Sequence, residues 1–445
     1  MKKTTVLTCL LLISMFFIKG CSDNAVVNNP GTSFVSVPAS SFSSGYAVSW
    51  SALVYRVLSD QQPNPPKCAR IYSYVSVAIY ESVINGIPNG RSLSGQLLEM
   101  PAIPPADPGL KYDWPSVIAA SVPKVLIASL DSLFPSSNVL INNLQQSQYD
   151  EREDSVGTEI FERSKLLGTT IADKIIEWKN TDKYTETRSM TYFPPPRTQN
   201  PAFWEPINPG DMALEPYWKL IRPFALDNFE AVAIHYPYTF DTIPGGPVYE
   251  EAIQVNSIAA NLTEDQKQTA VYWNDKLRTA TPTGHWFAIA DQVMETMNLK
   301  LDRVSQVYAI LGVTSRDAFI QCWKEKYDKN FLRPETYIRD YINKDFYAYI
   351  QTPSFPEYTS GHSTISGACA EVLTQMLGSF QFTDRTHVPL GYGERTYTNF
   401  HEAASEAGIS RLYGGIHFNS GNVNGTETGK RIAQYVINRI NLHTN

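Results

Sequence analysis

Two basic residues near the carboxyl-terminal end of the chain are spaced so that they could bind an oxyanion. Lys326 and Arg333 are seven residues apart, which is two turns of an α-helix, so the spacing predicts that both lie on one helix face. Pro334 is predicted to end that helix directly after Arg333. Two positive side chains on one face suit an anion, although a solvated basic face is the commoner explanation of this spacing taken alone.

A second segment places a serine, a glycine and a histidine at the start of a predicted helix. Ser360, Gly361 and His362 precede apolar residues at helical spacing. The first backbone N–H groups of a helix have no intrahelical partner and lie at the positive end of its dipole, so Ser360 and Gly361 could bind an oxyanion. His362 would lie one residue from that anion, where an imidazole can transfer protons. A capping or core histidine is the weaker alternative.

A third segment supplies another arginine and another histidine. A helix starting near residue 401 is predicted to end at Gly414 and Gly415, because two glycines allow a sharp turn. Arg411, on the last turn, offers a planar guanidinium to two oxyanion oxygens. His417 follows the turn. Each residue could be structural on its own, but the three segments together predict that their cations and histidines converge on one small anion.

In this order the segments resemble the signature of the superfamily of type 2 phosphatidic acid phosphatases and vanadium-dependent haloperoxidases, which reads K-x6-RP, P-S-G-H and S-R-x5-H-x3-D. Thr359 stands where the signature has proline, and Gly421 stands where it has the aspartate that orients the second histidine in phosphatases. Segments around Trp204 and Trp273 are similar to the larger bacterial haloperoxidase-type members. The resemblance therefore covers most of residues 46–440.

The resemblance implies one cationic cage that serves two chemistries, because histidine-bound vanadate resembles the transition state of phosphoryl transfer. The residues implied to bind the oxyanion are Lys326, Arg333, Ser360, Gly361 and Arg411. His417 is implied to be the vanadium ligand, and His362 the acid–base residue on the opposite face of the anion. Lys326 would complete the catalytic set by polarising the peroxide.

The implied fold is an all-α helical bundle, and the implied activity is that of a vanadate-dependent haloperoxidase, which uses peroxide to oxidise a halide. The alternative is an acid phosphatase of the same superfamily, which needs no vanadate and hydrolyses phosphate monoesters through a phosphohistidine at His417. The large N-terminal half favours the haloperoxidase. Gly421 favours it too, since a nucleophile needs orienting more than a static ligand does. A non-catalytic phosphate-binding lipoprotein would need the cations but not both histidines.

Phe355 and His285 are candidates for a halide or substrate pocket. Phe355 lies five residues before Ser360, at a position where the haloperoxidases have phenylalanine or histidine. Phenylalanine there resembles the chloride-oxidising type, while a core aromatic residue is an equally good explanation. Of the histidines outside the motifs, His285 is the one expected to line the pocket, and the others are expected to be structural or exposed.

The body of the chain that must position these residues is predicted to be almost entirely helical. Apolar stripes with helical spacing lie over residues 71–83, 160–178 and 432–440. Thr263 and Gln266 form a capping-box pair at another helix start. Long proline-rich segments are predicted to be ordered loops, and no alternating strand pattern or internal repeat stands out. We divide the body into an N-terminal helical region, 46–300, and a C-terminal catalytic region, 301–445.

The composition excludes disordered and fibrous proteins, because 43% of the 445 residues are hydrophobic and 12% are aromatic. The formal charge is −7 and no run of lysine or arginine is present, which argues against nucleic acid as a partner. Beyond the N-terminal segment the cysteines are Cys68, Cys322 and Cys369. Their odd number and their spacing exclude a disulfide scaffold and predict buried thiols.

The first residues of the chain are typical of an export signal. Two lysines precede an apolar run over residues 6–18, and a glycine–cysteine pair follows, as in bacterial lipoprotein signals. We expect residues 1–20 to be a signal peptide, Cys21 to be lipidated and residues 21–45 to be a tether; a plain secretory signal is the alternative. The protein is then expected in the cell envelope, periplasmic or at the surface, held to a membrane only by its lipid.

Overall fold

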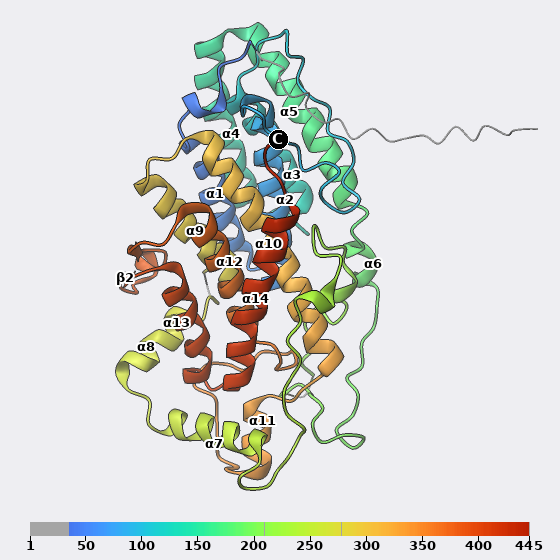
Figure 1. The fold of residues 1–445 in the computed structure, drawn as a ribbon, viewed down its shortest axis with the longest axis vertical. Coiled ribbons are helices and arrows are strands. Elements are labelled where there is room, and N and C mark those ends of the chain that lie inside the picture. The colour runs from blue at the N-terminus through green and yellow to red at the C-terminus, as the bar shows by residue number, and fades with distance from the viewer. Residues whose placement is uncertain (1–34, 209, 277, 445) are drawn as a thin grey trace, which may run out of the picture.

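The computed structural model describes residues 35–208, 210–276 and 278–444, which fold into an elongated, mostly helical body (Figure 1). The predicted signal peptide, the lipidation site Cys21 and the tether up to residue 34 lie outside the described residues. Within the described residues, no helix combines the length and the apolar character that crossing a membrane requires. The prediction of an all-α fold is confirmed.

The helices form two groups along the chain. The first group comprises α1 (Gly45–Gln61), α2 (Pro65–Val83), α3 (Trp114–Ser129), α4 (Pro135–Val156), α5 (Thr158–Lys179), α6 (Tyr184–Arg188), α7 (Pro247–Ala260), α8 (Glu264–Tyr272) and α9 (Thr281–Thr296). The second group, which carries the three motif segments, comprises α10 (Leu301–Lys329), α11 (Pro334–Tyr341), α12 (Gly361–Leu377), α13 (Phe400–Tyr413) and α14 (Asn419–Arg439). Short 3-10 turns lie at Ala39–Ser41, Ile84–Gly86, Trp218–Leu220, Phe229–Ala231 and Val388–Leu390.

One small sheet accompanies these helices in the described part of the chain. Strands β1 (Phe382–Asp384) and β2 (Arg395–Tyr397) pair antiparallel, with Thr383 opposite Thr396. Three residues per strand are too few to give an alternating pattern that stands out in the sequence. The sheet matters here because β1 ends at a buried carboxylate, Asp384, which belongs to the site described below.

Local sequence explains why several helices begin where they do. The side chain of Asn64 accepts a hydrogen bond from the backbone N–H of Lys67, and Pro65 occupies the first position of α2. At α8, Thr263 and Gln266 form the capping box that their spacing predicted. The three predicted apolar stripes lie in α2, α5 and α14.

The helix α10 is the central element of the core. It packs against α2 from the N-terminal region and against α12 and α14 from the C-terminal region. Gly312 allows the close approach to α2, because a Cβ there would lie 2.6 Å from the side chain of Ser76. All eight tryptophans are buried, and the cysteines at 68, 322 and 369 are buried and free, as predicted. One continuous core therefore supports the motif segments from both halves of the chain.

Helices α12 and α14 approach each other backbone to backbone. A Cβ at Gly367 of α12 would lie 2.2 Å from the carbonyl oxygen of Thr426, and a Cβ at Gly429 of α14 would lie 2.1 Å from that of Thr364. These distances are far below van der Waals contact, so each position requires glycine. We call this contact the glycine seam. It holds the N-terminal half of α12 directly against the middle of α14.

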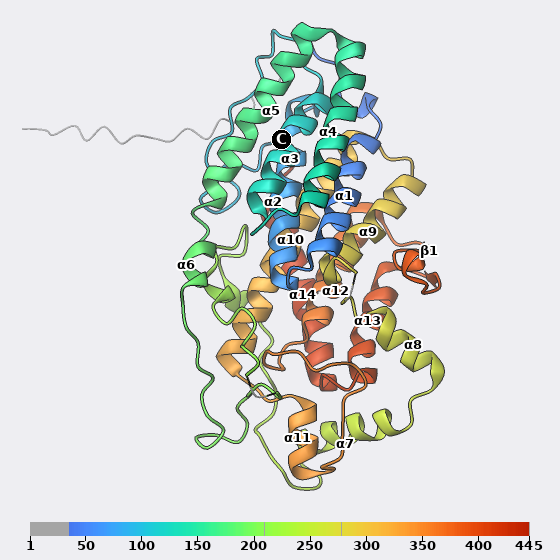
Figure 2. The same cartoon turned by 180° about the vertical axis from the view of Figure 1, so that it is seen from behind.

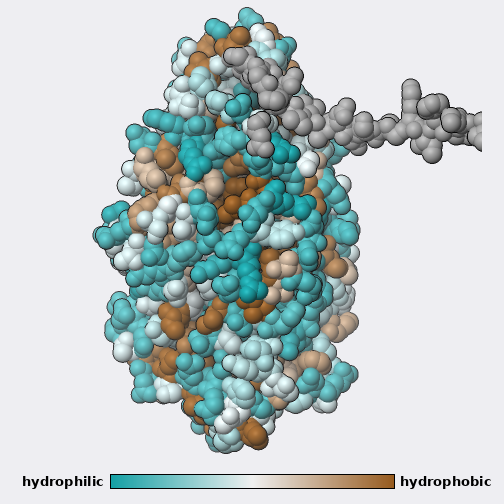
Figure 3. All heavy atoms as spheres, viewed as in Figure 1, coloured by the Kyte–Doolittle hydropathy of each residue, from teal (hydrophilic) through white to brown (hydrophobic). Residues whose placement is uncertain are grey.

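The motif segments lie between two distinct ends of the molecule. The helices α4 and α5 form one end, and α7 and α11 form the other (Figures 1 and 2). The face drawn in Figure 3 is mostly hydrophilic, with apolar residues in scattered patches. In the ribbon views, α14 starts near α11 and runs back along α10 toward the opposite end.

Candidate active site

Lys326 and Arg333 do not share a helix, so the predicted local structure is wrong at this point. The helix α10 ends at Lys329, Asn330 follows in the left-handed region with a φ of 50°, and Arg333 is the N-cap of α11. Asparagine adopts this conformation readily after a helix, and proline is favoured at the first position of a helix. Pro334 therefore starts α11 instead of ending α10.

The segment that precedes α12 nevertheless holds both cations together. Lys326 Nζ donates hydrogen bonds to the carbonyl oxygens of Pro356, at 3.0 Å, and Glu357, at 2.9 Å. Arg333 Nε donates to the carbonyl oxygen of Phe355 at 2.8 Å. The centroid of the half-buried Phe355 ring lies 4.9 Å from Lys326 Nζ and 4.7 Å from Arg333 Cζ. Phe355 thus forms an apolar wall beside the two charges.

Arg333 also joins the first motif to the third. Its Nη1 donates to the carbonyl oxygen of Ile416 at 2.8 Å and lies 3.1 Å from His417 Nε2. A guanidinium has no acceptor, so His417 Nε2 must accept and carries no hydrogen. Burial, and after it the charges of Arg333 and Lys326, hold the pKa of His417 well below its ordinary value. His417 is therefore a neutral ring with a bare Nε2.

A carboxylate that sequence reasoning missed, Glu357, orients His417. His417 Nδ1 donates to Glu357 Oε1 at 2.8 Å, and the backbone N–H of Phe418 donates to the same oxygen at 3.2 Å. A Cβ at Gly421 would lie only 2.3 Å from Glu357 Oε1, so Glu357 fills the space beside this glycine. Gly421 therefore does not leave His417 without a carboxylate, and it no longer favours a static ligand over a nucleophile. The available signal was an acid three residues before Ser360.

The first turn of α12 faces the same region. The backbone N–H of Ser360 donates to the carbonyl oxygen of Gly421 at 3.0 Å, which ties α12 to α14. Ser360 Oγ caps the helix by accepting from the backbone N–H of Ser363 at 3.4 Å and from Ser363 Oγ at 2.9 Å. The amide of Gly361 opens the helix at the positive end of its dipole, where an anion is stabilised.

Arg411 reaches the site from the last turn of α13. Its Nε donates to Ser410 Oγ at 3.0 Å, and its Nη2 donates to the carbonyl oxygen of Ala270 at 3.2 Å. Gly415, with a φ of 75°, makes the turn that leads from α13 to His417, as the glycine pair predicted. We refer to Lys326, Arg333, Arg411, His417 and the first turn of α12 as the anion cage.

The buried positive charges of the cage favour the binding of an anion. Burial lowers the pKa of Lys326 to about 7, and the neighbouring Arg333 adds to this effect. Burial also lowers the pKa values of Arg333 and Arg411 to about 10, and raises the pKa of Glu357 to about 7. Arg333 Nη2 is buried and, within the described residues, has no hydrogen-bond partner. A bound oxyanion would both pair this N–H group and offset the repulsion among the cations.

The second histidine of the site, His362, faces a carboxylate from the loop before α9. His362 Nε2 lies 3.2 Å from Asp275 Oδ2. Burial, followed by the charge of Arg411, lowers the pKa of His362 to about 4 even though Asp275 acts in the opposite direction. The ring is therefore neutral near pH 7. Nε2 lies within ion-pair distance of the carboxylate, but within the described residues the two atoms do not have the geometry of a hydrogen bond. A proton held on Nε2 by the charge of the carboxylate leaves Nδ1 as the nitrogen that can exchange a proton with a ligand.

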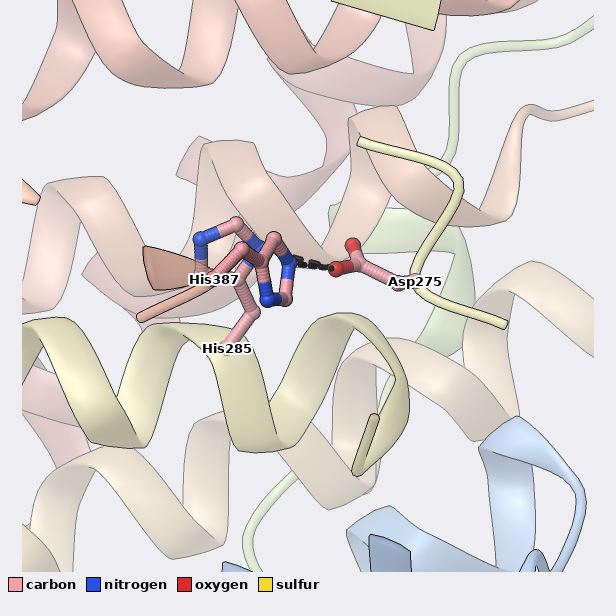
Figure 4. A group of neighbouring side chains, drawn as sticks. All are labelled: Asp275, His285 and His387. Atoms are coloured by element: carbon pink, nitrogen blue, oxygen red, sulfur yellow. Dashed lines mark hydrogen bonds and ion pairs between the residues drawn. The ribbon is translucent and has the colours of Figure 1, made fainter. Parts of the chain in front are cut away.

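Asp275 contacts two further histidines (Figure 4). Its Oδ1 lies 2.8 Å from His285 Nδ1 and 3.1 Å from His387 Nε2, and His285 Nε2 lies 2.7 Å from Asp384 Oδ2. Both rings are buried, and His285 is linked to His362 through Asp275, whereas Phe355 lies beside Lys326. The ligand atoms of Asp275, His285 and His387 lie within 4.8 Å of one another, close enough to hold a metal ion.

Known proteins resemble the chain in both sequence and structure. The family model of the VCPO second helical-bundle domain matches residues 306–445. The solved structure of a bacterial vanadium-dependent iodoperoxidase has 32% sequence identity and a TM-score of 0.83, and the match covers 91% of this chain and 98% of the iodoperoxidase. No curated protein matches the chain.

A bacterial vanadium-dependent chloroperoxidase, in its holo and apo forms, shares the fold at lower identity. The TM-scores are 0.66 and 0.63, and the sequence identity is 14% in both cases. The matches cover 84% and 83% of this chain and 92% of the chloroperoxidase chain in each form.

Proposed function

Because the chain belongs to the vanadium-dependent haloperoxidase family, we propose that its anion cage binds vanadate at His417 and that it oxidises iodide with peroxide. The observation that carries this proposal is the bare, buried Nε2 of His417 beside an unpartnered Arg333 N–H group. A neutral imidazole nitrogen is a metal ligand, and unpaired buried donors require an anion. Bound vanadate would supply a Lewis-acidic centre that activates peroxide without changing its own oxidation state.

Three kinds of group would hold the anion: positive side chains, backbone N–H groups and a histidine oriented by a carboxylate. The positive charges of Lys326, Arg333 and Arg411 would neutralise its oxygens, and the first turn of α12 would donate hydrogen bonds from its backbone. Glu357 holds His417 through Nδ1, so that Nε2 is directed at the anion. The buried setting strengthens each of these interactions, because little water competes for the charges.

Proton transfer is assigned to His362. Its neutral ring can accept a proton from peroxide at Nδ1 and return that proton to the leaving oxygen, while Nε2 remains directed at Asp275. A pKa lowered to about 4 keeps His362 in the basic form over the neutral pH range. Lys326 would polarise the peroxide from the Phe355 side of the cage.

The proposed preference for iodide is based on the overall sequence identity with the iodoperoxidase and not on a single residue. The iodoperoxidase shares 32% identity with this chain, whereas the chloroperoxidase shares 14%. The sequence-based argument from Phe355, which pointed to chloride, concerns one half-buried ring that also packs against Trp323 at a centroid distance of 5.1 Å. We therefore propose iodide as the first halide and bromide as the second to be assayed.

The deciding experiment is reconstitution of purified protein with orthovanadate, followed by iodide-dependent and bromide-dependent peroxide consumption. His417→Ala should abolish tight vanadate binding and activity, because the one bond from the protein to vanadium is lost. His362→Ala should retain vanadate and lose about 10²–10⁴-fold in turnover, as is typical of a missing general acid–base group. His401→Ala, on α13 and paired with Glu371, is the matched control and should keep wild-type activity.

A second candidate function, phosphate-ester hydrolysis, is favoured by the Glu357–His417 hydrogen bond. A carboxylate that orients the ring is what a phosphohistidine mechanism needs, since His417 Nε2 would attack phosphorus and His362 would protonate the leaving group. Brisk hydrolysis by vanadate-free protein, together with no halide-dependent peroxide consumption after reconstitution, would make the phosphatase the correct assignment.

We also propose that the protein is exported and held to a membrane by a lipid on Cys21. The support is the charged start, the apolar run and the glycine–cysteine junction of the N-terminal sequence.

A further inference from the structure

We propose that His285 is a permanently charged imidazolium and a positioning residue for His362: it holds Asp275 ionised and in place, and thereby keeps His362 neutral. This inference rests on the proposed role of His362 as the base that accepts the peroxide proton. It concerns the three-histidine cluster around Asp275, whose members come from the loop before α9, from α9 itself, from the segment after β1 and from α12.

The geometry of His285 requires two ring hydrogens. Nδ1 lies 2.8 Å from Asp275 Oδ1 and Nε2 lies 2.7 Å from Asp384 Oδ2, and the side chains of all three residues are fully buried. A neutral imidazole carries one N–H group, so it could satisfy only one of these carboxylates. The ring also stacks on Trp273, with a centroid distance of 4.4 Å and an interplanar angle of 26°, which suits a cation.

Asp384 is already supplied with donors, and Oδ1 of Asp275 faces two imidazole nitrogens, so neither oxygen that His285 contacts is expected to take its proton. Asp384 Oδ2 also accepts from Tyr272 Oη at 2.6 Å, and Asp384 Oδ1 accepts from the backbone N–H of Thr386 at 2.9 Å. Burial alone would raise the pKa values of Asp275 and Asp384 and lower that of His285. The charge pairing reverses each effect, holding both carboxyl pKa values well below their ordinary range and raising the pKa of His285 to about 10.

This arrangement leaves one oxygen of Asp275 for His362. Oδ1 is shared by His285 and His387 (Figure 4). The other oxygen, Oδ2, lies 3.2 Å from His362 Nε2. The imidazolium offsets part of the carboxylate charge that would otherwise stabilise a proton on His362. His387 must be neutral as well, because its ring centroid lies 4.3 Å from that of the charged His285. One charged and two neutral rings therefore surround a single carboxylate.

Other elements also direct charged or titratable groups at this array. These groups are Tyr55 from α1, Tyr272 from α8, Asp384 from β1, Arg395 and Tyr397 from β2, Arg411 from α13 and His417 after it. Burial raises the pKa values of the three tyrosines well above neutrality, and the arginines stay charged. The rings whose protonation responds to the charge on His285 are therefore His387, which packs against it, and His362, which is the one placed at the anion cage.

A divalent metal ion held by Asp275, His285 and His387 is the competing explanation of the cluster. Tetrahedral ligand atoms at zinc distances lie roughly 3.3 Å apart. The separation of 2.8 Å between Asp275 Oδ1 and His285 Nδ1 is that of a charge-assisted hydrogen bond instead. The observed distances thus favour a proton between these atoms.

The first test measures the protonation state of His285 directly and depends neither on vanadate nor on turnover. In protein labelled with ¹⁵N-histidine, a ring protonated on both nitrogens at about pH 8.5 is expected, and His285→Gln should remove this signal. If no ring is doubly protonated at that pH, the proposal is wrong. Zinc or another divalent metal that is retained stoichiometrically on purification and lost in His387→Ala would also overturn it, in favour of a metal site.

The second test measures how the charge on His285 affects the pKa of His362 in the vanadate-loaded enzyme. His285→Gln removes the charge while keeping a hydrogen-bonding side chain, so the acid limb of the rate–pH profile should move up by about one pH unit. Vanadate affinity should change by less than about threefold, because His285 touches no cage residue. His401→Gln is the control and should leave the profile unchanged. An unshifted acid limb in His285→Gln would refute the inference, whereas an inactive wild-type enzyme would instead refute the proposed function.

Discussion

Replacing Glu357 with alanine should weaken vanadate binding by about 10- to 100-fold, the usual cost of losing the group that orients a metal-ligating histidine. Glu357 Oε1 accepts from His417 Nδ1 at 2.8 Å and from the backbone N–H of Phe418 at 3.2 Å. The truncation leaves a buried Nδ1–H group without an acceptor, which costs about 1–3 kcal/mol. That cost falls on the empty and the vanadate-loaded protein alike, so the expected loss of affinity, about 1.4–2.8 kcal/mol, comes from the lost orientation of His417.

The assay is a vanadate dissociation constant measured by calorimetry, with the thermal midpoint recorded to confirm folding. Glu357→Gln should bind more tightly than Glu357→Ala, because the amide oxygen can still accept from His417 Nδ1. Glu371→Ala is the matched control, since this buried glutamate also pairs with a histidine, His401 at 3.3 Å, but lies outside the cage. We expect its dissociation constant to equal that of the wild type.

Moving the carboxylate from position 357 to position 421 tests directly whether a carboxylate must orient His417. Gly421→Asp alone should weaken vanadate binding, because the new Cβ would lie 2.3 Å from Glu357 Oε1 and displace that carboxylate from His417. The double variant Glu357→Ala with Gly421→Asp should recover part of the loss, since the aspartate then has the vacated space. A folded Glu357→Ala protein with wild-type vanadate affinity would refute the role assigned to Glu357.

Filling the cage should make Lys326 take up a proton. Burial lowers its pKa to about 7 in the empty cage and a bound anion raises it, so vanadate binding at about pH 8.5 should consume close to one proton, measured by calorimetry in buffers of different ionisation enthalpy. Gly429→Ala should destabilise the protein by about 1–3 kcal/mol in urea unfolding, because its Cβ would lie 2.1 Å from a carbonyl oxygen of α12. Gly393→Ala, which has open space around it, should be neutral. Cys21→Ser should move the protein from the membrane fraction to the soluble fraction, and unchanged fractionation without lipid label would contradict lipidation.

Much of the fold was predictable because it depends on short-range patterns. The apolar stripes and the capping box predicted helices, and the structure has α2, α5, α8 and α14 at those places. The position of Arg333 was wrong because two local preferences competed. The seven-residue spacing favoured one helix, while asparagine after α10 and proline at the start of α11 favoured a break between two helices.

The hydrogen-bonding partners of the histidines could not be predicted in the same way. The motifs name His362 and His417, but Asp275 is far from both motifs in the sequence, and Glu357 was marked only by its place three residues before Ser360. Such contacts arise only when packing brings distant segments together, and the same holds for the link from His285 to Asp384 on β1. Gly421 illustrates the difficulty, because the missing aspartate suggested that His417 has no orienting carboxylate, whereas Glu357 from another segment takes that role.

The glycine seam between α12 and α14 bears on how the enzyme selects among the tetrahedral anions around it. Because the seam packs the N-terminal half of α12 directly against α14, the first turn of α12 has little room to close around one anion and exclude another of similar size. Phosphate, usually far more abundant than vanadate, is then admitted to the same donors and competes for them. Under the proposed function, discrimination would fall to His417 Nε2, a neutral nitrogen that can serve as a ligand to vanadium but would bond to phosphorus only during group transfer. The chemical difference between the two elements, and not the shape of the protein, would therefore set how much phosphate the enzyme tolerates in its surroundings.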